Sequence, residues 1–483
     1  MMLCASLLCL SLCSCTALSI FEWDSMPPET AEHGNDKDGD PDPNDTESEP
    51  MGDRLEAARK ENAAAFAAAP DGDFGGMSFI VTSSWINNLF GTSEGRTELS
   101  REKYIRQKTL SEKYNTEIVQ TQAYLGGIEK GLSDSKASGM VYTHLLAVSA
   151  YYVGTLSYKG LIGSINALPY VNTDRPYYDA DFCENMRTPT GLYALYGDAC
   201  RDETSFWTVL YNRTLTERAG IFDIEQTVKS GDFTVDMLCK YIKMAEPDDA
   251  EKDDGYFSVV CEDRENAIES FYVSCKMNSV SLSEKELKVN DNAERGDELV
   301  RMMKLLFDPA DTRWEDIDYM PEQIFLEGKA AFYITVLNSS RYLSGMSDVW
   351  GILPMPSLYE NDGYRSALSR STTVICYPGF SVHTNEIGMM TEALFACSYK
   401  ILDAVLFDEL LHKHVRMEAA LDMIDIILDS TVCDMTLLYA DEYANFRAGT
   451  KDAFFQSYYD DVLYSERFYE RRYAADRSLT YVK

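Results

Sequence analysis

The chain has 483 residues, which is enough for two ordinary domains rather than one small module. Hydrophobic residues make up 45% and charged residues 25%, so most of the chain can bury a core; collagens, mucin stalks and wholly disordered proteins are excluded. Acidic residues number 79 against 44 basic ones, and no basic stripe appears, so we expect no nucleic-acid partner.

Residues 1–15, MMLCASLLCLSLCSC, are predicted to be a signal segment outside the fold. They are apolar and uncharged, and too few to cross a bilayer of about 30 Å. The segment ends in Leu12-Cys13-Ser14-Cys15, which resembles a bacterial lipobox. That resemblance implies cleavage before Cys15 and lipidation of its thiol, on the outer face of a Gram-positive-type cell membrane. An ordinary cleaved signal is the alternative.

Residues 16–76 are predicted to be a tether. The stretch 27–53 holds ten acidic residues and one lysine, so we expect it to be disordered. Its acids at 36, 38, 40 and 47 are spaced like a calcium loop, but Pro41 occupies the place where that loop needs glycine, so no metal site is predicted. The Ala-rich stretch 55–69 ends before Pro70 and predicts a short helix.

From residue 77 onward, short β-branched runs alternate with helical patterns. Thr234 is placed as a helix N-cap, with Phe233 and Leu238 as a hydrophobic staple. Met417, Leu421, Ile424 and Leu428 mark one apolar helix face. The alternation predicts an α/β fold with parallel sheets. We predict a helix at 99–114 and strands at 77–82, 116–121, 145–150, 209–211, 256–260, 330–336, 351–354 and 372–377.

Signals for catalysis, cofactors and metals are mostly negative. There is no P-loop, no GxGxxG after a strand and no GxSxG elbow, so no catalytic residue and no cofactor are predicted. His412 and His414 are two positions apart on a predicted helix and cannot chelate one metal together. None of the eight cysteines after the signal forms a CxxC pair. We expect buried thiols, with Cys183 and Cys200 the pair to test for a disulfide.

An ordered series of motifs over residues 78–440 resembles a known family. KTLSEKYNTEI at 108–118 and LLAVSAYYVGTLSYKGLIGSINALPYVNTDRPYYD at 145–179 are followed by FWTVLYNRTLTERAG at 206–220 and GDFTVDML at 231–238. FLEGKAAF, WGILPMP and YRS complete a late block, and 418–439 resembles the final helix. Tyr177 and Tyr178 stand where relatives have tryptophans. The series resembles the family 1 extracellular solute-binding lipoproteins of ABC importers, of clostridial type.

The resemblance implies a two-lobe periplasmic-binding-protein-like α/β fold of type II, with a central ligand cleft and a hinge. We place lobe 1 at 77–203 and 324–383, and lobe 2 at 204–323 and 384–483. It also implies a monomer that captures a small solute, most often a sugar, and passes it to the membrane subunits of an ABC permease. The chain itself would then carry out no reaction and would touch the membrane through its lipid anchor only.

Six residues follow as candidate ligand contacts, because solutes bind beyond the carboxyl ends of strands in such sheets. Aromatic rings cover the apolar faces of sugars, and polar side chains meet their hydroxyls. Only one of Tyr151 and its neighbour Tyr152 can face the cleft if both are extended. The candidates are Trp85, Ser149, Tyr151, Tyr178, Trp207 and Asn338.

Three other interpretations of the chain stay open. A peptide or another polar solute is the main rival to a sugar. A secreted glycosidase would need two carboxylates about 5–10 Å apart across a cleft, and the abundance of acids makes any chosen pair uninformative. A surface scaffold could use the same fold without transport.

Overall fold

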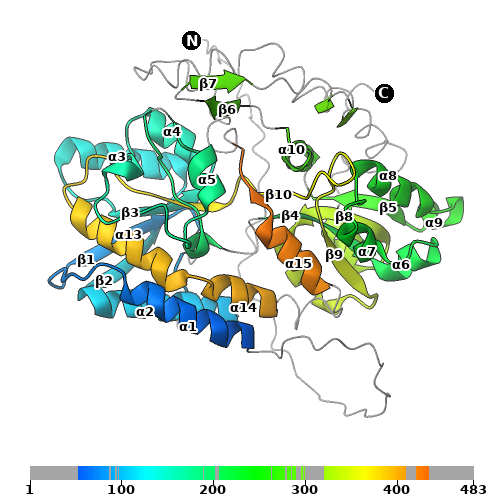
Figure 1. Cartoon of the computed structure of the whole chain (residues 1–483), viewed down its shortest axis with the longest axis horizontal. Coiled ribbons are helices and arrows are strands. Elements are labelled where there is room, and N and C mark those ends of the chain that lie inside the picture. The colour runs from blue at the N-terminus through cyan, green and yellow to red at the C-terminus, as the bar shows by residue number, and fades with distance from the viewer. Residues whose placement is uncertain are drawn as a thin grey trace, which may run out of the picture. The chain divides into compact units, whose positions relative to one another are not determined.

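The computed structural model describes residues 53–409 and 420–434, apart from gaps at 86–88, 93–94, 96, 189, 202–205, 263, 278–279, 284–285, 290–294, 297 and 300–319. The signal segment, Cys15, most of the tether, His412, His414 and the chain after Asp434 lie outside the described residues. Two four-stranded sheets organise the described part (Figure 1).

The first sheet has the order β11-β3-β1-β2. β1 lies between β2 and β3 and is parallel to both, whereas β11 is antiparallel to β3. Phe79, Val81, Leu146 and Val148 of this sheet have no exposed surface. Burying each such side chain contributes roughly 1.5–3 kcal/mol. The strands are β1 (Ser78–Ser83), β2 (Glu117–Gln122), β3 (Leu145–Ser149) and β11 (Thr373–Cys376).

Helices around the first sheet are positioned by short polar signals. Thr97 caps the helix at 98–114, accepting a hydrogen bond from Ser100 N at 3.0 Å, and Asn115 ends it in the left-handed conformation. The helices are α1 (Asp53–Ala67), α2 (Glu98–Tyr114), α3 (Leu125–Ser138), α4 (Tyr152–Tyr158), α5 (Ala180–Asn185), α13 (Thr384–Ser398) and α14 (Ile401–Glu409), with 3₁₀ turns η1 (Ile165–Ala167) and η2 (Asp198–Cys200).

The second sheet has the order β5-β8-β4-β9. β5 and β8 are parallel, but β4 is antiparallel to both β8 and β9. The prediction of parallel sheets is confirmed for β1 with β2 and β3 and for β5 with β8, but β4 is antiparallel to its neighbours and β11 is antiparallel to β3, so both sheets are mixed. The strands are β4 (Trp207–Asn212), β5 (Phe257–Cys261), β8 (Ala330–Val336) and β9 (Trp350–Pro354).

The helices beside the second sheet include the one that the sequence predicted most sharply. Thr234 caps it by accepting from Met237 N at 3.1 Å, and Phe233 and Leu238 are both fully buried, as a hydrophobic staple requires. The helices are α6 (Arg213–Arg218), α7 (Ile224–Lys229), α8 (Val235–Met244), α9 (Asp249–Asp253), α10 (Arg264–Ser274), α12 (Pro321–Leu326) and α15 (Ala420–Asp429), with the 3₁₀ segment η4 (Leu337–Gly345).

The lobe bounds predicted from the sequence differ from the strand pairing. Residues 330–336 and 350–354 were assigned to lobe 1, yet they form β8 and β9 on either side of β4. Helices α13 and α14 were assigned to lobe 2, yet they pack on α1 and α2. The physical reason is that β4 needs hydrogen-bonding partners on both edges, and β8 and β9 provide them. The sequence pattern of a strand shows that a strand forms but not which sheet the strand joins.

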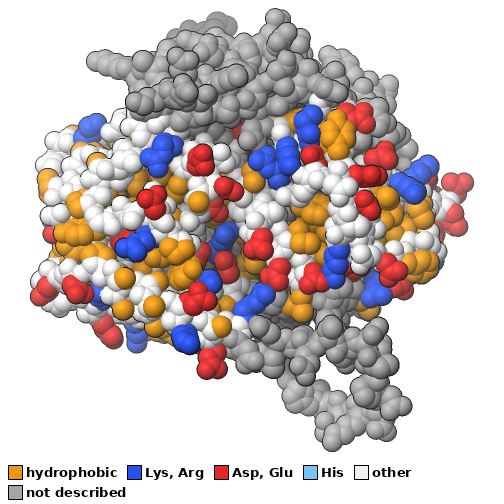
Figure 2. Space-filling view, viewed as in Figure 1, with side chains coloured by type: hydrophobic (Ala, Val, Ile, Leu, Met, Phe, Trp, Pro, Cys, Tyr) orange, Lys and Arg blue, Asp and Glu red, His pale blue; other side chains and the backbone are white. Residues whose placement is uncertain are grey.

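Two small ladders complete the fold. β10 (Ser366–Ala367) pairs in parallel with β12 (Thr431–Val432), and β6 (Val280–Ser283) pairs with β7 (Glu286–Val289). β10 opens the segment 366–373, which runs into β11; we call it the crossing segment. Figure 2 shows acidic, basic and apolar side chains interspersed over the face in view. No described helix is long and apolar enough to cross a membrane.

Candidate functional site

The carboxyl ends of the first sheet's parallel strands carry small polar side chains. β1, β2 and β3 end at Ser83, Gln122 and Ser149. Ser84 Oγ accepts from Ser149 N at 2.9 Å and lies 3.3 Å from Ser149 Oγ, while Gln122 Nε2 donates to the Ser84 carbonyl at 3.3 Å. The buried hydroxyl of Ser83 has no hydrogen-bond partner in the described part of the chain. Small polar groups therefore gather at the edge where ligands of such sheets bind, but Ser83, Ser84 and the predicted contact Ser149 are all buried.

Two of the predicted aromatic residues lie at the same edge. Trp85 follows directly after Ser84, and 46% of its surface is exposed. Tyr151 follows β3, is half-buried, and stands edge-on to Tyr152 with 4.6 Å between ring centroids. Tyr152 is buried in the core, so Tyr151 is the member of the pair with accessible surface. The edge thus combines polar groups with accessible rings.

The second sheet presents the carboxyl ends of β5, β8 and β9 at one edge, where β4 begins. Trp207, the first residue of β4, pairs with Val336 at the end of β8 and is buried. Asn338 lies just beyond β8, in η4, and is half-buried. The Leu337 amide donates to the Phe206 carbonyl at 2.9 Å, which holds η4 against the start of β4. Trp207 and Asn338 therefore belong to one edge.

Glu262 is a residue of this edge that sequence reasoning missed. It is the first residue after β5, it is exposed, and its amide donates to the Ile334 carbonyl of β8 at 3.0 Å. Its carboxylate oxygen Oε2 accepts from Thr335 Oγ1 at 3.1 Å, from Ser339 Oγ at 3.5 Å and from the Tyr333 hydroxyl. Among 79 acidic residues it had no distinguishing mark except its place directly after a buried strand.

The crossing segment brings the two edges together. Leu368 forms a bridge with Phe206, the residue before β4. The Arg370 carbonyl accepts from the Tyr151 amide at 3.4 Å, and Thr373 pairs with Ser149. Since one residue spans at most about 3.6 Å, the two attachment points at 368 and 370 are at most about 7 Å apart. Ser149, Tyr151, Trp207 and Asn338 are thereby gathered around one segment, with Trp85 joined to them through Ser84.

Tyr178 is a correction to the predicted site, because the structure places it in the core. It is buried, its ring lies 4.5 Å from that of Phe395 in α13, and its hydroxyl donates to Glu392 Oε2 at 2.7 Å. Tyr177 donates to the other oxygen of the same carboxylate. The physical reason is that the buried Glu392 needs hydrogen-bond donors, and the two adjacent tyrosines supply them.

Replacing Tyr178 with phenylalanine tests this structural role. We expect Tyr178→Phe to lower the free energy of unfolding by about 1–2 kcal/mol, because the buried carboxylate loses a donor. Affinity for any bound solute should stay unchanged. Urea unfolding and calorimetric titration measure the two quantities, with the exposed Tyr170→Phe as the matched control. Weaker solute binding at unchanged stability would return Tyr178 to the site.

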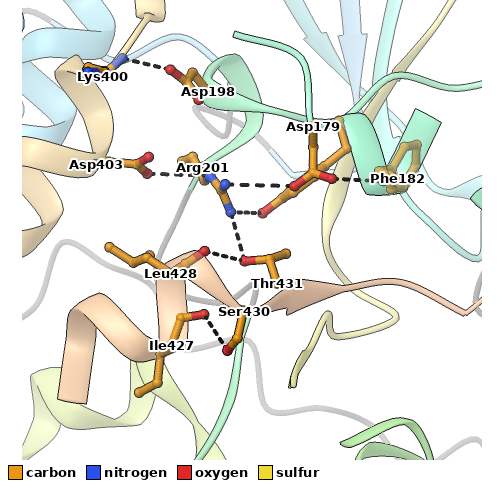
Figure 3. Close-up of polar contacts among 11 residues, drawn as sticks. Asp179, Phe182, Asp198, Arg201, Lys400, Asp403, Ile427, Leu428, Ser430 and Thr431 are labelled. Atoms are coloured by element: carbon orange, nitrogen blue, oxygen red, sulfur yellow. Dashed lines mark hydrogen bonds and ion pairs between the residues drawn. The ribbon is translucent and has the colours of Figure 1, made fainter. Parts of the chain in front are cut away.

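Arg201 is buried at the centre of a cluster of polar and charged side chains that come from several elements (Figure 3). Its Nη1 donates to Thr431 Oγ1 of β12 at 3.3 Å, and its Nε lies 3.4 Å from Asp403 Oδ1 of α14. Its Nη2 lies 3.8 Å from Asp179 Oδ2, at the start of α5. Because β12 pairs with β10, this one guanidinium links helices of the first sheet to the ladder that opens the crossing segment.

A third carboxylate makes this cluster sensitive to pH. Asp198 is buried, and its Oδ2 accepts from the Lys400 amide at 2.7 Å. Burial, together with the neighbouring Asp403, raises the pKa of Asp198 to about 8. Burial also raises the pKa of Asp179. The folded state therefore holds a proton on Asp198 at neutral pH, which the unfolded chain releases near pH 3.8.

This proton predicts that stability falls as pH rises through the folded pKa. Because folding raises the pKa of Asp198, the folded state binds this proton more tightly than the unfolded chain does. The resulting stabilisation is complete below pH 3.8 and is lost as the pH rises toward 8. His144 acts in the opposite sense below pH 6.5, because burial lowers its pKa to about 4. We therefore expect unfolding free energy to drop between pH 6.5 and 8, by up to about 1.4 kcal/mol per pH unit. Asp198→Asn should flatten this slope in urea titrations; an unchanged slope would contradict the assignment.

The cysteines are thiols in the described structure. Cys183 and Cys200 are both buried and lie outside any disulfide, and burial raises the pKa of the Cys183 thiol to about 12. The disulfide offered as a test is therefore not formed. Over the described ranges, no group of three His, Cys, Asp or Glu residues is arranged to hold a metal ion.

Comparison with known proteins finds likeness in structure but not in sequence. No family model and no curated protein sequence matches the chain. A cyclo/maltodextrin-binding protein complexed with maltotetraose is similar with a TM-score of 0.53 at 12% identity, covering 83% of this chain and 96% of that one. An ABC substrate-binding protein from Listeria monocytogenes in complex with cycloalternan gives 0.50 at 12%, covering 81% and 100%.

A third solved structure agrees with these two. The galacto-N-biose-/lacto-N-biose I-binding protein of the ABC transporter from Bifidobacterium longum, in complex with lacto-N-biose, has a TM-score of 0.50 at 11% identity, covering 76% of this chain and 90% of that one. Since each match spans most of both chains, the likeness concerns the whole architecture. The chain therefore has the two-lobe, periplasmic-binding-protein-like α/β fold of ABC-transporter solute-binding proteins.

Proposed function

We propose that this protein is an extracellular receptor that captures a small carbohydrate and delivers it to an ABC permease. One observation carries the proposal: the carboxyl ends of both sheets, where α/β folds bind ligands, meet at the crossing segment. Rotation of the two halves about the crossing segment and the Arg201 cluster would close the site over the solute.

The chemistry of the two edges favours a sugar. A sugar presents apolar C–H faces and a rim of hydroxyls. Trp85 and Tyr151 offer accessible ring surface, and the half-buried Asn338 supplies an amide group, while the buried Ser149 lies behind them. The structurally similar proteins described above were solved with oligosaccharides bound, which supports the same ligand class.

The proposal is one of binding without chemistry. The receptor works as a monomer, held at the outer face of the membrane by lipid on Cys15, and its macromolecular partner is the permease. The lipobox-like sequence supports the anchor. Labelling of the expressed chain with a radioactive fatty acid tests it, and an unlabelled chain would leave only a cleaved signal.

A thermal-shift panel tests the function. A solute that binds only the native state stabilises it by RT ln(1 + [L]/Kd), which is about 2.7 kcal/mol at a hundredfold excess over Kd. We expect one class of mono- or oligosaccharide to raise the melting temperature by several degrees and to be recovered uncleaved. A shift with short peptides alone would discard the carbohydrate, and cleaved product would indicate a glycosidase. No shift with either would favour the scaffold.

A further inference from the structure

Glu262 is placed where it can meet a bound solute. It follows β5 directly, and the end residue of β5, Cys261, is in register with Ile334 of β8. Across β8, Thr335 is in register with Thr208 of β4, the neighbour of Trp207. Strands in a sheet are about 4.8 Å apart, so Glu262 lies roughly two strand spacings from Trp207 along the same edge.

The carboxylate of Glu262 is held in a fixed position by hydroxyl groups of β8 and η4. Tyr333, Thr335 and Ser339 are buried, and their hydroxyls converge on one oxygen, Oε2. Thr335 and Ser339 are also linked to each other, with 2.7 Å between their Oγ atoms. Three donors on one oxygen fix the position of that oxygen and restrict the rotation of the side chain. Among the described side chains no donor reaches Oε1, and the residue is exposed.

The charge around Glu262 is negative within the described structure. Burial and the charge of Glu262 raise the pKa of Glu322, in α12, to about 6. Lys329 forms its ion pair with Glu327, next to the start of β8 and hence at the opposite end of that strand. No described lysine or arginine pairs with Glu262. An anionic solute group placed at Oε1 would therefore meet repulsion.

We infer that Glu262 selects the solute by charge: it accepts hydrogen bonds from hydroxyl or ammonium groups of a sugar and rejects sugars carrying carboxylate or sulfate at that position. The inference rests on the proposed function and adds the charge class of the solute. The solute is then a neutral or cationic sugar. A purely structural role for Glu262, as an acceptor for Tyr333, predicts a change in stability without a change in selectivity.

The experiment compares Glu262→Gln with the unmodified chain and with Glu327→Gln, a matched control at the end of α12, just before the opposite end of β8. The probes for calorimetric titration are maltotriose, cellotriose and N-acetylchitotriose as neutral sugars, chitosan trimer as the cation and trigalacturonic acid as the anion. We expect the unmodified chain to bind a neutral or cationic probe and not the anion. Glu262→Gln should weaken that binding about 10- to 100-fold, since a hydrogen bond to a charged group is lost.

The readout that separates selectivity from structure is the ratio of affinities for differently charged probes. Glu262→Gln should reduce the cation-to-neutral ratio and admit the anion, whereas Glu327→Gln should leave every ratio unchanged. An unmodified chain that binds the anion best, or ratios that Glu262→Gln does not move, would overturn the inference and leave sugar binding intact. Binding of none of the five probes, together with a thermal shift by peptides, would overturn the proposed function itself.

Discussion

Replacing Arg201 with methionine should lower the free energy of unfolding by roughly 3–5 kcal/mol, the largest loss expected from any single change considered for this chain. The guanidinium is buried and faces Asp179, Asp198 and Asp403. It also lies over the rings of Tyr196 and Phe206, at 5.3 and 5.5 Å from their centroids. Its removal leaves the half-buried carboxylates of Asp179 and Asp403 without a counter-charge and takes a hydrogen-bond donor from Thr431.

Two further variants make the Arg201 prediction specific. Because total stability of a domain is about 5–15 kcal/mol, Arg201→Met could prevent folding, so Arg201→Lys, which keeps the charge, is measured beside it and should lose less. Arg213→Met removes an exposed pair with Glu217 and should change stability by less than about 1 kcal/mol. Urea unfolding at pH 7 gives all three values. Equal stabilities for the Arg201→Met and Arg213→Met proteins would contradict a buried cluster.

Truncating Trp85 should weaken sugar binding by about tenfold or more while leaving stability nearly unchanged. The side chain is 46% exposed, so its loss removes little core packing. Stacking an apolar sugar face on an indole ring is the interaction that the truncation removes, and about 1.4 kcal/mol of lost affinity corresponds to a factor of ten. Calorimetric titration of Trp85→Ala with the sugar found by the thermal panel measures the effect.

A matched exposed aromatic residue separates contact from a general surface effect. Phe222 is 63% exposed and lies between α6 and α7, on the side where β4 ends rather than where it begins. Phe222→Ala should leave sugar affinity unchanged. Equal affinities for the Trp85→Ala and unmodified proteins would remove Trp85 from the site, and a large loss of stability in Trp85→Ala would assign it to packing instead.

The local elements were predictable because their signals are local. Every predicted strand is found within a few residues of its expected bounds, since runs such as 330–336 are β-branched, apolar and bounded by turn residues. The cap at Thr234 was equally clear, because capping depends on residues within one turn. The partner of each strand was not predictable, since pairing of β8 with β4 depends on contacts far apart in sequence.

The candidate site was predictable only in part, for the same reason. Ser149 and Trp207 could be placed at sheet edges because they lie at the ends of recognisable strands, but the strand pattern did not show that both side chains are buried. Tyr178 was misplaced because an aromatic residue in a loop has the same pattern whether it faces a solute or a buried carboxylate such as Glu392. Glu262 was missed because its three hydroxyl donors are separated from it by about 70 residues of chain or more.

Hydrogen–deuterium exchange on the purified chain, with and without the sugar found by the thermal panel, tests the central claim most directly. A solute held where the two sheet edges meet should slow exchange at 83–85, 149–151, 206–208 and 337–340, and along the crossing segment 366–373. The cavity lined by Lys229, Tyr364 and Asp422 beside α15 should show no such change. Protection confined to one sheet edge, or found at that cavity instead, would contradict a site built from both sheets.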